Sequence, residues 1–166
     1  MSSFNSKLAA LGIEPMAGPS FEPLSEESIA QLQGKLGVSL PEAYARFLTT
    51  YGCSMFSREI NCTPQGSPLY FGWFYGFDEL LDAIDTYREV LPEAIIPIGD
   101  DGAGNQFCLG LDGDDFGKVY FHNHSIGWHA DAEKYEERGE VVPTKIRYQT
   151  VHLIADSLEA FIDGMV

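Results

Sequence analysis

Basic residues are scarce in this sequence of 166 residues, which has ten lysines and arginines against 25 aspartates and glutamates and a formal net charge of −15. Nucleic-acid-binding proteins neutralise phosphates with lysine and arginine, and the same cations attract anionic lipid surfaces. The shortage of cations therefore argues against nucleic acid and membrane as partners. The charge either keeps the protein soluble or attracts a basic protein.

Cysteine and long apolar runs are also in short supply. Cys53, Cys62 and Cys108 are odd in number and show no CxxC spacing, so the sequence indicates neither a disulfide framework nor a zinc knuckle. Near the start, the apolar run 8–11 is too short for the core of a signal peptide, and no run approaches a membrane-spanning length. We therefore expect a cytoplasmic protein.

The motifs of common catalytic and phosphate-binding sites are missing. No G-x-S-x-G occurs, and Cys53 has no evident base to activate it. The Gly-Lys pair at 117–118 lacks both the upstream glycine and the following serine or threonine of a phosphate loop. Asp112 and Asp114 resemble the start of a calcium loop, but its twelfth position is Asn123 instead of glutamate. We expect no enzymatic activity and no cofactor.

The best metal candidates are His122 and His124, which lie two residues apart on an expected strand and so share a face. His129 or a nearby carboxylate would have to supply a third ligand. The alternative is that both histidines are structural, and we favour it because the sequence specifies no third ligand. We therefore expect no metal, and a metal-dependent enzyme remains a third hypothesis, testable by a metal assay.

Acidic residues are concentrated between Asp78 and Asp115, where eleven of them stand against a single basic residue, Arg88. Such a concentrated field steers a basic partner and speeds its association. Asp100 and Asp101 belong to a turn in which aspartate serves the backbone. The better candidates for binding a partner are six other carboxylates: Glu79, Asp82, Asp85, Glu89, Asp114 and Asp115.

Three aromatic residues are candidate interface anchors, because aromatic side chains dominate binding hot spots: Trp73, Tyr75 and Trp128. The first two lie in the run 69–75, which has too many aromatics for a strand with one face in water, unless a helix or a partner covers part of it. Burial in the core is the alternative for each of the three.

Apolar periodicity and turn residues outline the elements. Helices are expected over 25–36, 41–51, 78–91 and 156–162, with Ser25, Asp78 and Asp156 as N-caps and Gly37 and Gly52 as stops. Strands are expected over 58–63, 69–75, 95–98, 106–112, 118–124 and 150–154. Residues 125–149 are interpreted as a surface excursion with a helical turn at 131–138.

Helices and strands do not alternate regularly in this order, so we expect an α+β fold with a mostly antiparallel sheet flanked by helices. Residues 1–24, with several prolines and room for a short helix over 6–11, are interpreted as an N-terminal arm. Residues 25–166 then form a single domain.

Four stretches, in this order along the chain, resemble motifs of the SUKH superfamily, the Smi1/Knr4-like domains. The motif LP-x-x-Y-x-x-F-L…G matches residues 40–52, and IPIG-D-G-G-N matches 96–105. Residues 117–124, GKVYFHNH, are similar to G-x-V-Y-x-W-D-H, and 154–162, IADSLEAFI, to A-x-S-F-x-x-F-L. The sequence departs from these motifs at three positions: His122, Asn123 and Leu158.

The resemblance implies an α+β binding scaffold with no catalytic residues or cofactor to carry over. Its members are mainly immunity proteins of bacterial toxin systems, and their eukaryotic relatives include a fungal cell-wall assembly regulator. Our hypothesis is a non-catalytic immunity protein that binds and neutralises a cognate toxin domain, which would be basic if charge guides the encounter. The alternative is a regulatory scaffold that gathers cellular partners without any toxin.

Overall fold

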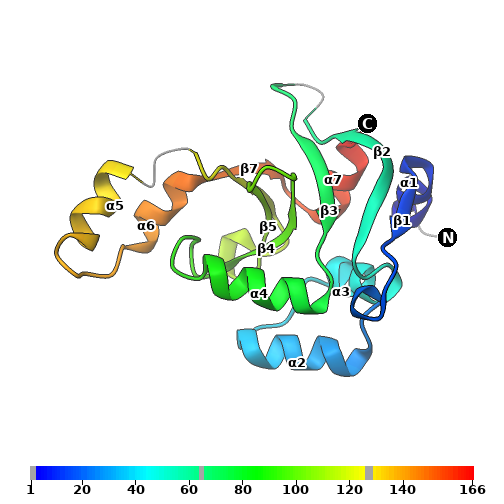
Figure 1. The fold of residues 1–166 in the computed structure, drawn as a ribbon, viewed down its shortest axis with the longest axis horizontal. Helices are drawn as coiled ribbons and strands as arrows, with labels where there is room; N and C mark the ends of the chain where they lie inside the picture. The colour runs from blue at the N-terminus through cyan, green and yellow to red at the C-terminus, as the bar shows by residue number, and fades with distance from the viewer. Residues whose placement is uncertain (1–2, 64–65, 126–128) are drawn as a thin grey trace.

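In the part of the chain that the structure describes, seven antiparallel strands follow one another through a single sheet in the order of the sequence, β1 to β7 (Figure 1). The computed structural model describes residues 3–63, 66–125 and 129–166. The expected α+β fold is confirmed. The strands are β1 Ile13–Pro15, β2 Ser54–Asn61, β3 Tyr70–Phe74, β4 Ile95–Asp100, β5 Gln106–Gly110, β6 Val119–His122 and β7 Val151–Ala155.

Helices lie between the strands and at both ends of the described chain. The α-helices are α1 Ser3–Leu11, α2 Glu26–Leu36, α3 Glu42–Thr50, α4 Phe77–Tyr87, α5 His129–Glu136, α6 Thr144–Arg147 and α7 Leu158–Gly164. The described residues also form three short 3-10 helices, η1 Pro19–Phe21, η2 Gly113–Asp115 and η3 Tyr148–Thr150. Among the α-helices, α6 was not expected from the sequence. In the described part of the chain, no helix has both the length and the apolar character needed to cross a bilayer.

The main core lies on one face of the sheet and is centred on Phe71. Its ring centroid is 4.3 Å from that of Phe74, 4.8 Å from Phe107 on β5 and 6.1 Å from Phe161 on α7. Tilted rings at these distances pack favourably. Helix α3 joins the same core through Phe47, whose ring lies 4.4 Å from that of Phe74. The aromatic run in β3 is therefore covered mostly by the protein itself.

The opposite face of the sheet carries a second, smaller apolar cluster. Leu91 and Ile95 pack there with residues of β5, β6 and β7, and Tyr87 at the end of α4 lies against them. All residues of β4 from Ile95 to Gly99 are consequently buried. The sequence of a strand covered on both faces is typically a continuous apolar run, and that of β4 begins with one.

Two of the expected helix caps are wrong. Helix α4 has Gly76 as its N-cap instead of Asp78, and the Glu79 carboxylate accepts the Gly76 backbone N–H at 3.1 Å. Helix α7 is capped by Ser157 instead of Asp156, with the serine hydroxyl accepting from the Ala160 N–H at 3.0 Å. Ser157 offers capping chemistry as good as that of Asp156, whereas Gly76 has no side chain and the N-terminus of α4 is instead capped by the Glu79 carboxylate from the third helical position.

The chain before residue 25 contributes to the sheet. Strand β1 pairs with β2, with Ile13 opposite Phe56, and Leu8 and Leu11 of α1 are buried. The sequence did not predict β1, and it placed β2 too late, at 58 instead of 54. The boundary at residue 24 stays a prediction.

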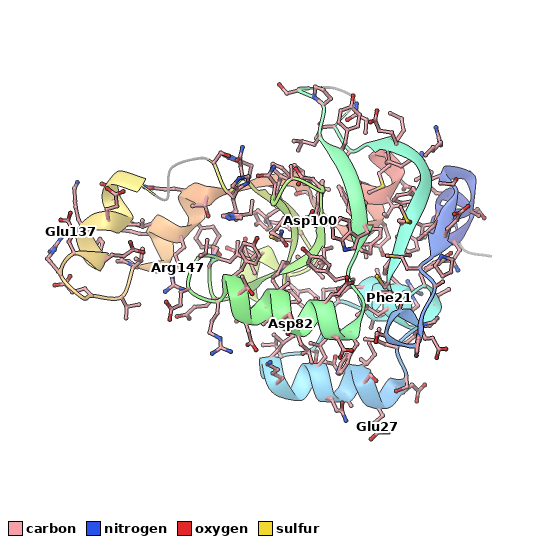
Figure 2. The ribbon with its side chains drawn as sticks, in the orientation of Figure 1. Phe21, Glu27, Asp82, Asp100, Glu137 and Arg147 are labelled. Atoms are coloured by element: carbon pink, nitrogen blue, oxygen red, sulfur yellow. The ribbon has the colours of Figure 1, made fainter. Side chains whose placement is uncertain are left out.

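The excursion between β6 and β7 includes the expected helix α5 and the additional helix α6, which extend to one side of the sheet (Figure 1). A small apolar cluster of Ala132, Val142 and Ile146 holds the two helices together, with Tyr135 against it. The buried Arg147 joins this unit to the end of α4 (Figure 2).

Candidate functional site

A row of exposed carboxylates runs along α4. Asp78, Asp82 and Asp85 follow one another at spacings of four and three residues, which places them on one side of the helix, and Glu89 comes in the turn just after α4 ends at Tyr87. Leu80 and its neighbours face the core on the other side. Figure 2 marks Asp82 in this row. Three of the carboxylates predicted to bind a partner therefore share one surface.

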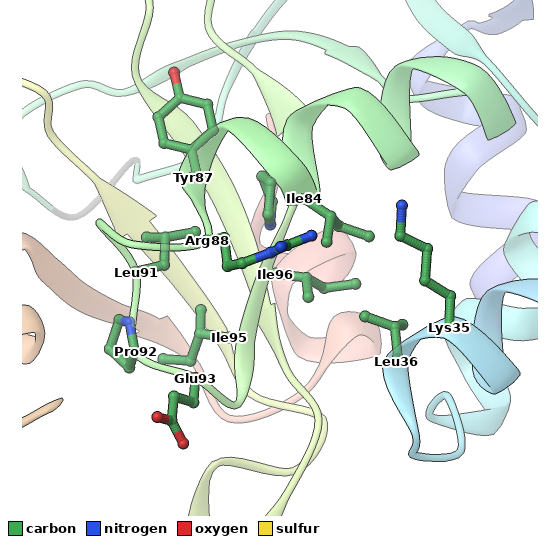
Figure 3. Close-up of a pocket in the computed structure, with 11 residues that line it drawn as sticks. Lys35, Leu36, Ile84, Tyr87, Arg88, Leu91, Pro92, Glu93, Ile95 and Ile96 are labelled. Atoms are coloured by element: carbon green, nitrogen blue, oxygen red, sulfur yellow. The ribbon is translucent and has the colours of Figure 1, made fainter. Parts of the chain in front are cut away.

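A cavity of about 280 Å³ opens beside this row, between α2, α4 and β4 (Figure 3). Its apolar lining comes from segments far apart in the sequence: Leu36, Ile84, Leu91, Pro92, Ile95 and Ile96. Leu36 closes α2, Ile84 faces inward from α4, and the rest belong to the loop before β4 or to β4 itself. The cavity is thus walled by residues that also belong to, or pack against, the two apolar clusters.

Two cations at the mouth of this cavity are tied to one carboxylate. Lys35 of α2 places its Nζ 3.2 Å from Asp85 Oδ2, and Arg88 donates to Asp85 Oδ1. The hydrogen bond from Lys35 is the main reason that the pKa of Asp85 lies below its ordinary value. Figure 3 shows Lys35 on α2 and Arg88 at the end of α4 among the residues that line the cavity. The arrangement connects α2 to α4 over the cavity.

A second cavity, of about 170 Å³, adjoins the first and shares Leu36 and Glu93 with it. Its other walls include Ala94, Leu111 and Asp112. A backbone hydrogen bond of 2.7 Å from Leu111 N–H to the Ala94 carbonyl oxygen holds the two loops together. We call the two cavities together the α2–α4 groove.

The carboxylates around the groove are mostly free of basic partners. Glu93 and Asp112 line the groove and are exposed, as is Glu89 next to Arg88, and none of the three forms an ion pair with any residue that the structure describes. Lys35 and Arg88 share the single negative charge of Asp85, and with these three carboxylates the six residues carry a net charge of −2. The unmatched charge at this surface is therefore negative, as the sequence predicted from composition.

Glu79, another predicted partner-binding residue, is used inside the protein. Besides capping α4, its Oε2 accepts a hydrogen bond from the Cys53 thiol at 3.1 Å. The pKa of Cys53 is raised to about 12, mainly by burial and further by the Glu79 carboxylate. Burial alone raises the pKa of Cys62 to about 12.

We expect the thiols of the native protein to react very slowly with a disulfide reagent at pH 8. The thiolate is the reactive species, and a pKa near 12 lowers its fraction roughly 1,000-fold relative to an ordinary cysteine. A reaction with Ellman's reagent should titrate three thiols quickly in denaturant and almost none beforehand. A fast native reaction at Cys53 would contradict the buried contact with Glu79.

Asp115, also predicted to bind a partner, forms hydrogen bonds within the protein. Its two carboxylate oxygens accept hydrogen bonds from the hydroxyls of Tyr120 on β6 and Tyr148 on η3. Burial first, and then this carboxylate, raises the pKa of Tyr148 to about 12. Asp115 thus joins η2 to β6 and η3, whereas its neighbour Asp114 is exposed.

Two of the predicted aromatic anchors, Trp73 and Tyr75, do not line the groove. Tyr75 is buried and donates from its hydroxyl to Gln106 Oε1. Trp73 is half-buried on β3, with its ring 6.4 Å from that of Tyr75. Trp128 lies outside the described residues.

The histidine pair has structural partners. His122 is buried, with Nδ1 at 3.2 Å from the Thr150 carbonyl oxygen, and burial lowers its pKa. His124 lies beyond the end of β6, with Nδ1 at 2.7 Å from Asn105 Oδ1. The side chain of His129 lies outside the described residues. Within the described ranges, no three histidines, cysteines or carboxylates cluster as metal ligands would.

Sequence reasoning missed the groove itself. Its apolar walls read as ordinary core positions, because Leu36, Ile84 and Leu91 each fit the inner face of a helix. The only local sign of the groove in the sequence was Leu91 followed by Pro92. Proline stops a helix, and the leucine before it leaves apolar surface at the end of α4. That Lys35 approaches α4 could not be inferred from spacing.

Comparison with known proteins agrees with the motifs. The SPbeta prophage-derived uncharacterized protein YokK of Bacillus subtilis (strain 168) is similar to this chain, with 28% identity over 182 residues that cover 96% of the chain and 83% of YokK. Residues 23–164 match the SMI1/KNR4 family (SUKH-1), which confirms the resemblance inferred from the four motifs. Since this match spans most of the sequence, the chain belongs to the SMI1/KNR4 (SUKH-1) family.

Proposed function

We propose that this protein is a non-catalytic immunity-type protein that binds a cognate bacterial toxin domain and blocks it. Membership of the SUKH-1 family supports a protein-binding role. The observation that carries the proposal is the row of exposed carboxylates on α4 beside the groove, which offers a basic toxin both charge and apolar contact. Opposite charges speed the encounter, and desolvated apolar contacts supply the affinity.

The first test is co-expression with the protein encoded immediately upstream. A tight one-to-one complex that restores growth supports the proposal. Several weak cellular partners and no such complex would instead favour a regulatory scaffold.

If a complex forms, its affinity should depend on the α4 carboxylates. We expect the double variant Asp82→Lys/Glu89→Lys to weaken binding by at least about 100-fold, mainly through a slower association rate. The matched control is Glu133→Lys/Glu137→Lys on the α5 side, which changes the net charge equally and should bind nearly as well as the native protein. Association rates measured at low and high salt should differ strongly for the native protein and little for the α4 variant. Equal losses for the two variants would show that total charge matters and the α4 surface does not.

A further inference from the structure

We propose that the α2–α4 groove is an anchor site for one large apolar side chain of the partner, flanked in the partner's sequence by lysine or arginine. This inference rests on the proposed function and adds the chemistry of the segment that binds. It concerns the main cavity of the groove, between α2, α4 and β4.

The cavity has the size and lining that such an anchor requires. An apolar cavity of about 150 Å³ is enough to bind benzene. The main cavity, at about 280 Å³, therefore has room for a leucine, methionine or phenylalanine side chain. Its apolar lining includes Ile84 of α4, Leu91 of the following loop and Ile96 of β4. Anchors in pockets of this kind provide most of the affinity of a protein interface.

The charges at the mouth determine what flanks the anchor. Lys35 and Arg88 share the single negative charge of Asp85, and the three exposed carboxylates of Glu89, Glu93 and Asp112 bring the net charge of these six residues to −2. Glu89 follows Arg88 in the exposed turn after α4, and Glu93 lines both cavities. Both glutamates lack a basic partner among the described residues. A segment with cations on each side of its anchor would match them.

Short peptides test this chemistry without the toxin. The probes are capped peptides of sequence Lys-Lys-X-Lys-Lys, with X as leucine, phenylalanine or serine, together with Glu-Glu-Leu-Glu-Glu. We expect the leucine and phenylalanine peptides to shift the amide NMR signals of Leu36, Ile84 and Ile95, and to bind at least about 10-fold more tightly than the serine and acidic peptides. Equal binding of the leucine and serine peptides would overturn the anchor, and equal binding of the acidic peptide would overturn the charge preference.

A variant that fills the cavity gives a second, independent test. Leu36 is half-buried at the rim, so Leu36→Trp should occupy the space without removing core volume, and binding of the leucine peptide should fall at least about 10-fold. The control Ala160→Trp, at an exposed position on α7, should leave binding unchanged. Full binding by a folded Leu36→Trp variant would overturn the proposal.

The two proposals fail separately. Peptide binding at the groove without any toxin complex would contradict the proposed function alone. A toxin complex that is indifferent to Leu36→Trp would contradict the anchor site and leave the proposed function standing.

Discussion

Replacing Gly110 by alanine is expected to destabilise the protein by about 4 kcal/mol, because β5 passes directly against η2 at this position. An added Cβ would overlap the Asp115 carbonyl oxygen and lie 2.7 Å from its carbonyl carbon. The backbone there has little freedom to retreat. The Gly110 N–H donates to the Lys118 carbonyl oxygen and its own oxygen accepts from the Gly117 N–H, both at 2.9 Å.

The expected loss corresponds to a decrease in Tm of about 10 °C for a chain of this size. Urea unfolding followed by tryptophan fluorescence and circular dichroism would measure it. The matched control is Gly34→Ala in α2, where an added Cβ meets nothing within 4 Å. That change should stabilise the protein by about 0.5 to 1 kcal/mol, since alanine loses less backbone entropy than glycine in a helix. Similar stability of the Gly110→Ala variant and the native protein would show that η2 does not lie so close.

The helices were predictable because their signals are local. Ser25 accepts the Ser28 N–H at 3.1 Å, and Gly37 ends α2 with a φ of 71°, as the sequence indicated. The apolar spacing of Tyr44, Phe47 and Leu48 likewise predicted the inner face of α3. Signals of this kind depend on residues within one or two turns and persist whatever the rest of the chain does.

Features that depend on distant residues could not be predicted. Strand β1 is three residues long and ends in Pro15, which no local pattern marks as a strand; it forms because the edge of β2 is available to it. Glu79 looked like a surface carboxylate, and only the fold places Cys53 beside it. The close passage at Gly110 is a further example, since a strand glycine has several ordinary explanations.

The charge of the candidate site could be predicted from the sequence, but the shape of the groove could not. Asp82 and Asp85 stand on one side of α4 because helical spacing requires it, and Glu89 follows in the turn after the helix. Asp115 illustrates the limit, because the two tyrosine hydroxyls that bind it come from β6 and η3. The groove joins a helix end, a loop and a strand, and only the tertiary structure brings Leu36 next to Ile96.

Replacing Arg147 by methionine is expected to cost about 3 kcal/mol and to loosen one wall of the groove. Arg147 is buried, and its guanidinium donates to three backbone carbonyl oxygens: that of Val142 at 3.0 Å, that of Arg88 at 3.1 Å and that of Leu91 at 3.4 Å. Methionine matches much of the stem but leaves those oxygens without their donors. Two of them belong to the segment after α4 that lines the groove.

Hydrogen exchange followed by mass spectrometry would locate the effect. In Arg147→Met, faster exchange is expected over 88–91 and over the described helices α5 and α6, with little change in β2 or β3. The control Lys145→Met removes the same charge from an exposed position of the same helix and should leave exchange and stability nearly unchanged. Equal behaviour of the two variants would mean that total charge, and not the bonds to the carbonyl oxygens, connects this unit to α4. If the expected difference is found, peptide binding at the groove should also weaken in Arg147→Met. Arg147 lies outside the main cavity, but without its hydrogen bonds the loop that carries Arg88 and Leu91 would no longer be held in place.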